Sequence, residues 1–91
     1  MPFTPGQERL LTFPNRLDIK ATGKYDAHFE TLIVDIVRSH VAPDDLHAVR
    51  TRMSNANRYM AVTLTITASS YEQLDAIYQN LSDCGQVLFA L

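Results

Sequence analysis

The sequence predicts an α+β fold of the ferredoxin-like, split β-α-β type: a four-stranded antiparallel sheet, strand order 4-1-3-2, with two helices on one face. Three observations carry this prediction. The chain has 91 residues, which is enough for one domain and too few for two separate cores. The spacing of its apolar residues switches between the period of a strand and that of a helix. The resulting order β-α-β-β-α-β, joined by right-handed crossovers, places the first and third strands at the centre of the sheet.

The first half is a strand followed by a helix. Leu17, Ile19 and Ala21 alternate with polar residues, and this period of two predicts a strand with one buried face that ends at Gly23. From Asp26, the expected N-cap, the period becomes that of an amphipathic helix. Its apolar stripe consists of Phe29, Leu32, Ile33, Ile36 and Val37.

A hairpin follows, and its two strands differ in regularity. Leu46–Met53 predicts a weaker strand with Arg50 and Arg52 on one face. Residues 54–57 have the composition of a turn. Tyr59–Ala68 shows the clearest alternation in the chain, and its Thr and Val residues suit a pleated sheet.

A second helix and a last strand complete the order. Ser70 and Gln73 form a capping-box pattern, which predicts a helix that begins with Ser70 as N-cap. The apolar stripe of this helix consists of Leu74, Ile77, Tyr78 and Leu81. Gly85 ends the helix, and residues 86–91 form an apolar strand.

The domain is expected to span residues 10–91, behind a flexible leader over residues 1–9. The leader holds prolines and a glycine and has no periodic apolar pattern. Leu10, Leu11 and Phe13 are apolar, and we expect them to hold the next segment to the body of the domain.

Composition excludes several classes of function. The single cysteine, Cys84, rules out an intramolecular disulfide and a site built on paired cysteines. No apolar run approaches the roughly 20 residues of a membrane span and no signal peptide opens the chain, so we expect a cytoplasmic protein that does not bind membranes. Ser, His and Asp occur without the local context of a catalytic motif, so we expect no enzyme activity, no metal site and no cofactor.

The face of the sheet away from the helices is expected to be polar. RNA-binding domains of this architecture stack bases on aromatic residues of the two central strands. The corresponding positions here are Asp18, Lys20 and the threonines of the third strand, so we expect no nucleic-acid binding.

Charge is distributed unevenly along the chain. No acidic residue lies between Asp45 and Glu72, whereas the predicted helices are acidic. The basic hairpin suggests a site for an anion or an acidic partner, since Arg suits carboxylates and phosphates. Its candidate residues are Arg50, Arg52, Arg58 and Tyr59. The alternative is a solvated edge strand, whose charges prevent strand pairing.

The connection between the first strand and the first helix is a second candidate site. It consists of Thr22, Gly23, Lys24 and Tyr25. Helix N-termini present free N–H groups, and Gly lets a backbone approach a ligand closely, so these residues are candidates for binding a small carboxylate ligand. The alternative is a simple strand exit at the glycine.

The last strand predicts self-association. It lies at an edge of the sheet, and residues 87–91 are apolar on both faces. We therefore expect a homo-oligomer, a dimer through sheet edges, unless the segment from Leu10 to Phe13 covers this edge instead.

Several short motifs carry a resemblance to a known family. They are Leu10-Leu11-Thr12-Phe13-Pro14, Gly23 nine residues later, Arg38-Ser39-His40, and Ser54 followed by Tyr59, Val62 and Thr63. With this spacing, the chain resembles the small bacterial YbeD-like proteins, a family of unknown function, from about residue 10 to residue 91. The resemblance implies an ACT-like fold, similar to the regulatory module that binds amino acids in several metabolic enzymes. It also implies a lipoate-related regulatory role and a ligand near residues 22–24, often between two copies, and it supplies no catalytic residue.

Two functional hypotheses follow. The first is a non-catalytic regulatory or small-molecule-sensing module. The second is a protein-interaction adaptor that acts through the basic second hairpin and the sheet edges and binds no metabolite.

Overall fold

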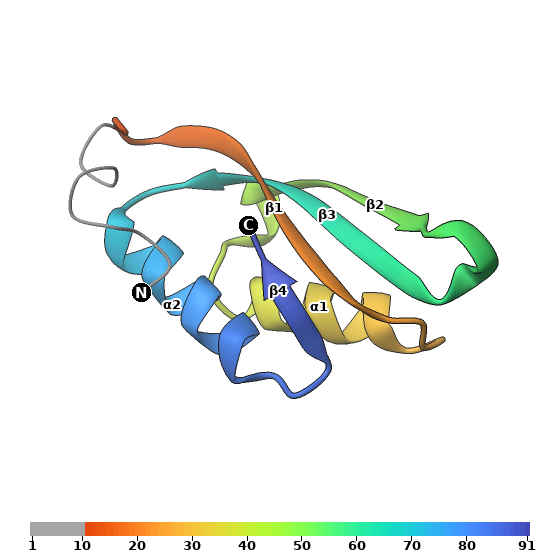
Figure 1. Ribbon diagram of the computed structural model, residues 1–91. Helices are drawn as coiled ribbons and strands as arrows, with labels where there is room; N and C mark the ends of the chain where they lie inside the picture. Colours follow the sequence, from red (N-terminus) through yellow and green to blue (C-terminus); the bar gives the residue numbers. More distant parts are fainter. Residues whose placement is uncertain (1–10) are drawn as a thin grey trace.

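Four antiparallel strands form one sheet in the computed structural model, which describes residues 11–91 (Figure 1). In chain order the elements are β1 (Asn15–Lys24), α1 (Phe29–Arg38), β2 (Leu46–Met53), β3 (Tyr59–Ala68), α2 (Tyr71–Asp83) and β4 (Val87–Ala90). The sheet order is β2-β3-β1-β4, which is the predicted order 4-1-3-2 counted from the other edge. The predicted fold class is therefore confirmed.

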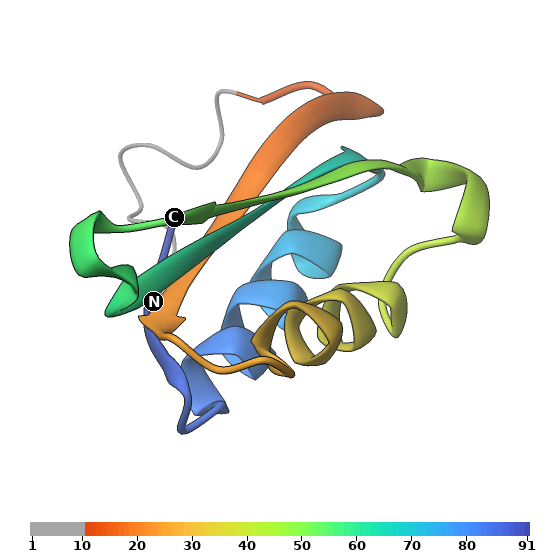
Figure 2. The ribbon, with the colours of Figure 1, turned by 90° about the vertical axis from the view of Figure 1, so that its right-hand side faces the viewer.

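Both helices cover the same face of the sheet (Figure 2). Their predicted apolar stripes form the core: the fully buried side chains are Phe29, Ile33 and Val37 of α1 and Leu74, Ile77 and Leu81 of α2. Alternate residues of the two central strands, such as Ile19 and Leu64, are buried against them. Each such burial contributes about 1.5–3 kcal/mol, so this layer supplies most of the driving force for folding.

The predicted N-cap of α2, Ser70, is confirmed, and the return bond of the capping box goes to Ser69 instead of Ser70. The Ser70 hydroxyl accepts a hydrogen bond from the Gln73 N–H at 3.1 Å. The Gln73 side chain accepts from the Ser69 N–H at 2.7 Å and donates to the His40 carbonyl at 2.8 Å. Gln73 therefore both caps its own helix and links it to the segment that follows α1.

The predicted start of α1 is wrong. The helix begins at Phe29, and Asp26 is not its N-cap. The Asp26 carboxylate instead accepts a hydrogen bond from the His28 N–H at 2.7 Å. Asp side chains often close such local turns two residues ahead, and this turn precedes the first helical residue.

Leu11 and Phe13 dock on the first turn of α2. The Tyr71 hydroxyl accepts from the Leu11 N–H at 2.6 Å, and the Phe13 and Tyr71 rings meet edge to face with centroids 4.8 Å apart. This part of the chain is thus held at α2 and does not cover the edge of β4. The expected leader over residues 1–9, and Leu10, lie outside the described residues.

Gly23 lies within β1, which continues to Lys24 instead of ending at the glycine. A Cβ atom at this position would lie 2.5 Å from the Gln86 carbonyl oxygen and 2.6 Å from the Phe29 ring. The missing side chain is therefore what allows the Phe29 ring and the segment before β4 to pack on β1 at the same point.

We expect Gly23→Ala to lower the free energy of unfolding by about 3 kcal/mol, because a methyl group there overpacks a backbone carbonyl and a buried ring. Gly85→Ala is the matched control, since a Cβ at Gly85 meets no atom within 4 Å. The control should leave stability unchanged or raise it by about 0.5 kcal/mol. Urea denaturation of both variants checks this, and equal effects would contradict the packing role of Gly23.

Candidate functional site

The sheet face opposite the helices carries the candidate site. Strand pairing sets its side chains in rows, because directly paired residues point to the same side of a sheet. One row runs through Arg52, Ala61 and Thr22, and the next through Arg50, Thr63 and Lys20. β4 extends these rows with Phe89 beside Thr22 and Leu91 beside Lys20. The expected polar face is thus confirmed over the central strands, and β4 adds an apolar border.

Small side chains at the centre of these rows leave two adjoining hollows. Ala61 projects only a methyl group between the larger side chains of Arg52 on β2 and Thr22 on β1. The larger hollow, about 310 Å³, is lined by Lys20, Arg50, Thr51, Arg52, Ala61 and Thr63. The smaller, about 200 Å³, shares Lys20, Arg52 and Ala61 with it and includes Tyr59.

One cation of the face is neutralised by a carboxylate. Arg50 Nη2 lies 3.2 Å from Asp18 Oδ2, and the Thr65 hydroxyl donates to Asp18 Oδ1 at 2.6 Å. The Thr65 hydrogen bond, and secondarily the positive charge of Arg50, lowers the pKa of Asp18 below its ordinary value of 3.8. Asp18 is therefore ionised at neutral pH and holds Arg50 in place.

Lys20 and Arg52 are different, because no carboxylate in residues 11–91 forms an ion pair with either of them. They lie diagonally across β3, Lys20 on β1 in the row of Thr63 and Arg52 on β2 in the row of Ala61, and both line the two hollows. Two cations held on either side of a concave surface attract an anion and repel a cation.

The two layers of the molecule carry opposite charge. The helices hold Glu30, Asp35, Glu72, Asp75 and Asp83 against Arg38. The open face holds Arg16, Lys20, Lys24, Arg50 and Arg52 against Asp18. These two sets of charges cancel, so a near-neutral molecule carries a basic face and an acidic layer.

The predicted hairpin residues meet only in part. Arg50 and Arg52 line the larger hollow, and Tyr59 lines the smaller one. Arg58 lines neither, and its carbonyl accepts a hydrogen bond from the Tyr25 N–H at 2.9 Å. Sequence reasoning did not select Lys20 as a site residue. The alternation of the first strand placed Lys20 on the open face, but only the register sets it opposite Thr63.

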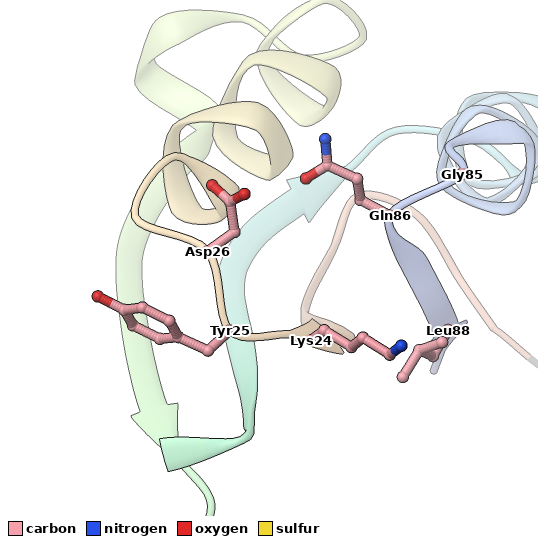
Figure 3. Close-up of a pocket in the computed structure, with 6 residues that line it drawn as sticks. All are labelled: Lys24, Tyr25, Asp26, Gly85, Gln86 and Leu88. Carbon is pink, nitrogen blue, oxygen red and sulfur yellow. The ribbon is translucent and has the colours of Figure 1, made fainter.

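The predicted loop residues separate. Thr22 faces the open side, and Gly23 is packed beneath Phe29. Lys24 and Tyr25 border another hollow of about 320 Å³, next to Asp26, Gln86 and Leu88 (Figure 3). There the Lys24 side chain extends toward Leu88 and the Tyr25 ring points the other way. A ligand role for these residues stays a prediction, and an anion would meet the Asp26 carboxylate at the start of α1.

Two other features bear on function. Within the described part of the chain, no group of three or more His, Cys, Asp or Glu residues is placed to hold a metal ion. Neither α1 nor α2 is long and apolar enough to cross a membrane.

Comparison with known proteins gives consistent matches along the chain. Residues 8–91 match the family described as "Protein of unknown function (DUF493)". A "UPF0250 protein" of Chromobacterium violaceum is 40% identical over 86 residues, covering 93% of this chain and 96% of the relative. Another, from Leptothrix cholodnii, is 37% identical over 90 residues and covers 96% of each chain.

Solved structures share the fold at low sequence identity. The ACT domain from the GTP pyrophosphokinase of Chlorobium tepidum has a TM-score of 0.68 at 10% identity, over 84% of this chain and 94% of that one. Protein HP0495 from H. pylori also has a TM-score of 0.68, at 11% identity, over 98% of this chain and 96% of that one. The expected ACT-like form of the fold is confirmed.

An NMR titration of Asp18 should give a pKa below 3.8, and Thr65→Val and Arg50→Gln should each raise that pKa, because the Thr65 hydrogen bond and the charge and hydrogen bond of Arg50 all stabilise the ionised carboxylate. Since the folded-state pKa is the lower one, Asp18 stabilises the fold above about pH 3.8, and this contribution is lost as the pH falls through the folded pKa. The free energy of unfolding of the Asp18→Asn variant should therefore fall less than that of the wild type when the pH is lowered from 5 to 2, which is about the range over which such a carboxylate titrates. An Asp18 pKa that does not change in Thr65→Val would contradict the network.

Proposed function

The chain belongs to the family described as "Protein of unknown function (DUF493)", and we propose that it is a non-catalytic regulatory module that binds a small carboxylate or phosphate anion on the open face of its sheet. This membership confirms the resemblance drawn from the motifs of the sequence. The similarity of its fold to an ACT domain supports a regulatory role by analogy only, since one fold serves many functions. The specific support comes from the open face.

The pair of cations formed by Lys20 and Arg52 carries the proposal. Both side chains border a hollow floored by Ala61 and Thr63, and no carboxylate of residues 11–91 forms an ion pair with them. Holding like charges on one small surface is unfavourable, so an anion between them would relieve the repulsion. The planar Arg fork and the Lys ammonium can each donate charge-assisted hydrogen bonds to a carboxylate or phosphate.

The positions of two histidines, side chains well suited to proton transfer, support the proposal that the module is non-catalytic. His47 Nε2 lies 2.6 Å from the Thr67 hydroxyl, and His40 Nε2 accepts from the Asn80 side chain at 2.7 Å. Neither histidine lines the hollows beside Lys20 and Arg52. A general base must lie within hydrogen-bond reach of the group it deprotonates, and these two lie outside the site.

A second candidate function, a protein-interaction adaptor that self-associates through its sheet edge, is favoured by β4. Leu88, Phe89 and the adjacent Leu91 are 52%, 54% and 70% exposed. β4 is the outermost strand on its side and carries no charged residue to discourage pairing with another strand. An antiparallel pair of β4 strands would join two sheets into one and support the expected dimer.

Inorganic phosphate or succinate at millimolar concentration should shift the amide resonances of Lys20, Arg52 and Ala61 in NMR spectra. The double variant Lys20→Gln/Arg52→Gln should weaken this binding at least tenfold, since each charged hydrogen bond is worth about 1.5–3 kcal/mol. Arg38→Gln is the control for the loss of a positive charge as such, because it removes a cation of the helical layer, away from the open face. The proposal is rejected if neither anion binds, or if Arg38→Gln weakens binding as much as the double variant does.

Light scattering should detect a dimer at micromolar concentration if β4 is the contact, and Leu88→Lys should give monomers, because charge on an edge strand blocks pairing. Met53→Lys on β2, the opposite edge, is the matched control and should leave the dimer intact. A wild-type monomer, or dissociation by Met53→Lys alone, would rule out the β4 contact.

A further inference from the structure

The two hollows on the open face form one continuous depression with chemically different ends. They share Lys20, Arg52 and Ala61. Among the other lining residues are Arg50 in the larger hollow and Tyr59 in the smaller one. A ligand lying across Ala61 would therefore meet cations and an aromatic ring together.

The floor of this depression is formed by a short side chain, that of Ala61. Ala61 stands directly opposite Arg52 on one side and Thr22 on the other. Side chains of paired residues stand about 4.5–5.5 Å apart at their Cβ atoms. A methyl group between longer neighbours leaves a shallow slot, which admits a flat group more readily than a branched one.

Tyr59 forms the end wall of the slot and is held there by the hairpin. Its N–H donates to the Ser54 hydroxyl at 3.0 Å, and its carbonyl accepts from the Ser54 N–H at 2.9 Å. Tyr59 is 42% exposed and does not belong to the hydrophobic core. Exposed aromatic side chains beside cations are common where planar ligands stack.

We propose that this slot binds a flat ring that carries an anionic group, with the anion between Lys20 and Arg52 and the ring over Ala61 against Tyr59. This inference rests on the proposed anion site and specifies its ligand. Each hollow alone, about 310 and 200 Å³, is at or below the lower end of small-molecule sites, so a ligand of this class would use both. Aryl carboxylates and nucleoside monophosphates share this chemistry.

Isothermal titration calorimetry and NMR with matched probes test the proposal. Benzoate is compared with acetate, and adenosine monophosphate with inorganic phosphate and with adenosine, which lacks the anion. We expect benzoate or the monophosphate to bind at least tenfold more tightly than its ring-free counterpart, and adenosine to bind more weakly than its monophosphate. If only benzoate binds, the anionic group of the ligand is a carboxylate. If only the monophosphate binds, that group is a phosphate. Either result supports the proposal.

Two variants locate the ring. Tyr59→Leu should reduce the affinity for the ring-bearing probe to that of acetate or phosphate and leave the small anions unaffected. Ala61→Leu should fill the floor of the slot and lower the affinity for the ring-bearing probe at least tenfold. Ala48→Leu is the matched control, since Ala48 lies on the same face opposite Thr65 and lines neither hollow, and it should have no effect.

The outcomes separate this inference from the proposed function. If acetate or phosphate binds in a manner that depends on Lys20 and Arg52, but the ring-bearing probes bind no more tightly, the ring site is wrong and the anion site stands. Equal loss in Ala61→Leu and Ala48→Leu would also overturn the ring site. If no anion binds, both proposals fail together.

Discussion

The antiparallel pairing of β1 with β3 is the constraint on which the rest of the molecule depends. The register runs without a shift from Asn15 opposite Ala68 to Lys24 opposite Tyr59. Because side chains alternate, a slip of one residue would move every buried residue of a strand to the other face. This pairing therefore decides at once which residues meet the helices and which remain on the open face. Both edge strands, β2 and β4, add to surfaces that the central pair has already defined.

The same alternation separates charge as well as hydrophobicity. Ile19 and Val62 lie in the core, whereas Lys20 and Thr63 lie opposite each other on the open face. The helices turn their apolar stripes to the sheet and their acidic residues outward, so the molecule has a basic face and an acidic layer. Asp18 is the exception on the basic face, and its contacts with Arg50 and Thr65 hold one cation. Of the other cations of this face, Lys20 and Arg52 line both hollows, and they make the open face a candidate for binding.

Packing at Gly23 decides what surrounds the loop after the first strand. The space that a glycine leaves beside a backbone can serve a ligand or a neighbouring part of the protein. Here the Phe29 ring and the Gln86 carbonyl take that space, and Asp26 already accepts the hydrogen bond of the His28 N–H. Residues close in sequence thus point to different surroundings, while residues distant in sequence converge on Ala61. Convergence of this kind follows from strand order and register, which local sequence does not contain.

By itself, the sequence determined the class and order of the elements, because periods of two and of 3.6 in apolar residues are local properties. It also identified the Ser70 cap and the basic hairpin from short motifs. Tertiary structure alone decided that Leu11 and Phe13 dock on Tyr71, and that Arg58 lies outside the hollows. It also brought Lys20 into the site beside Arg52. These outcomes depend on contacts between residues far apart in the chain, and only the packed sheet and helices set those distances.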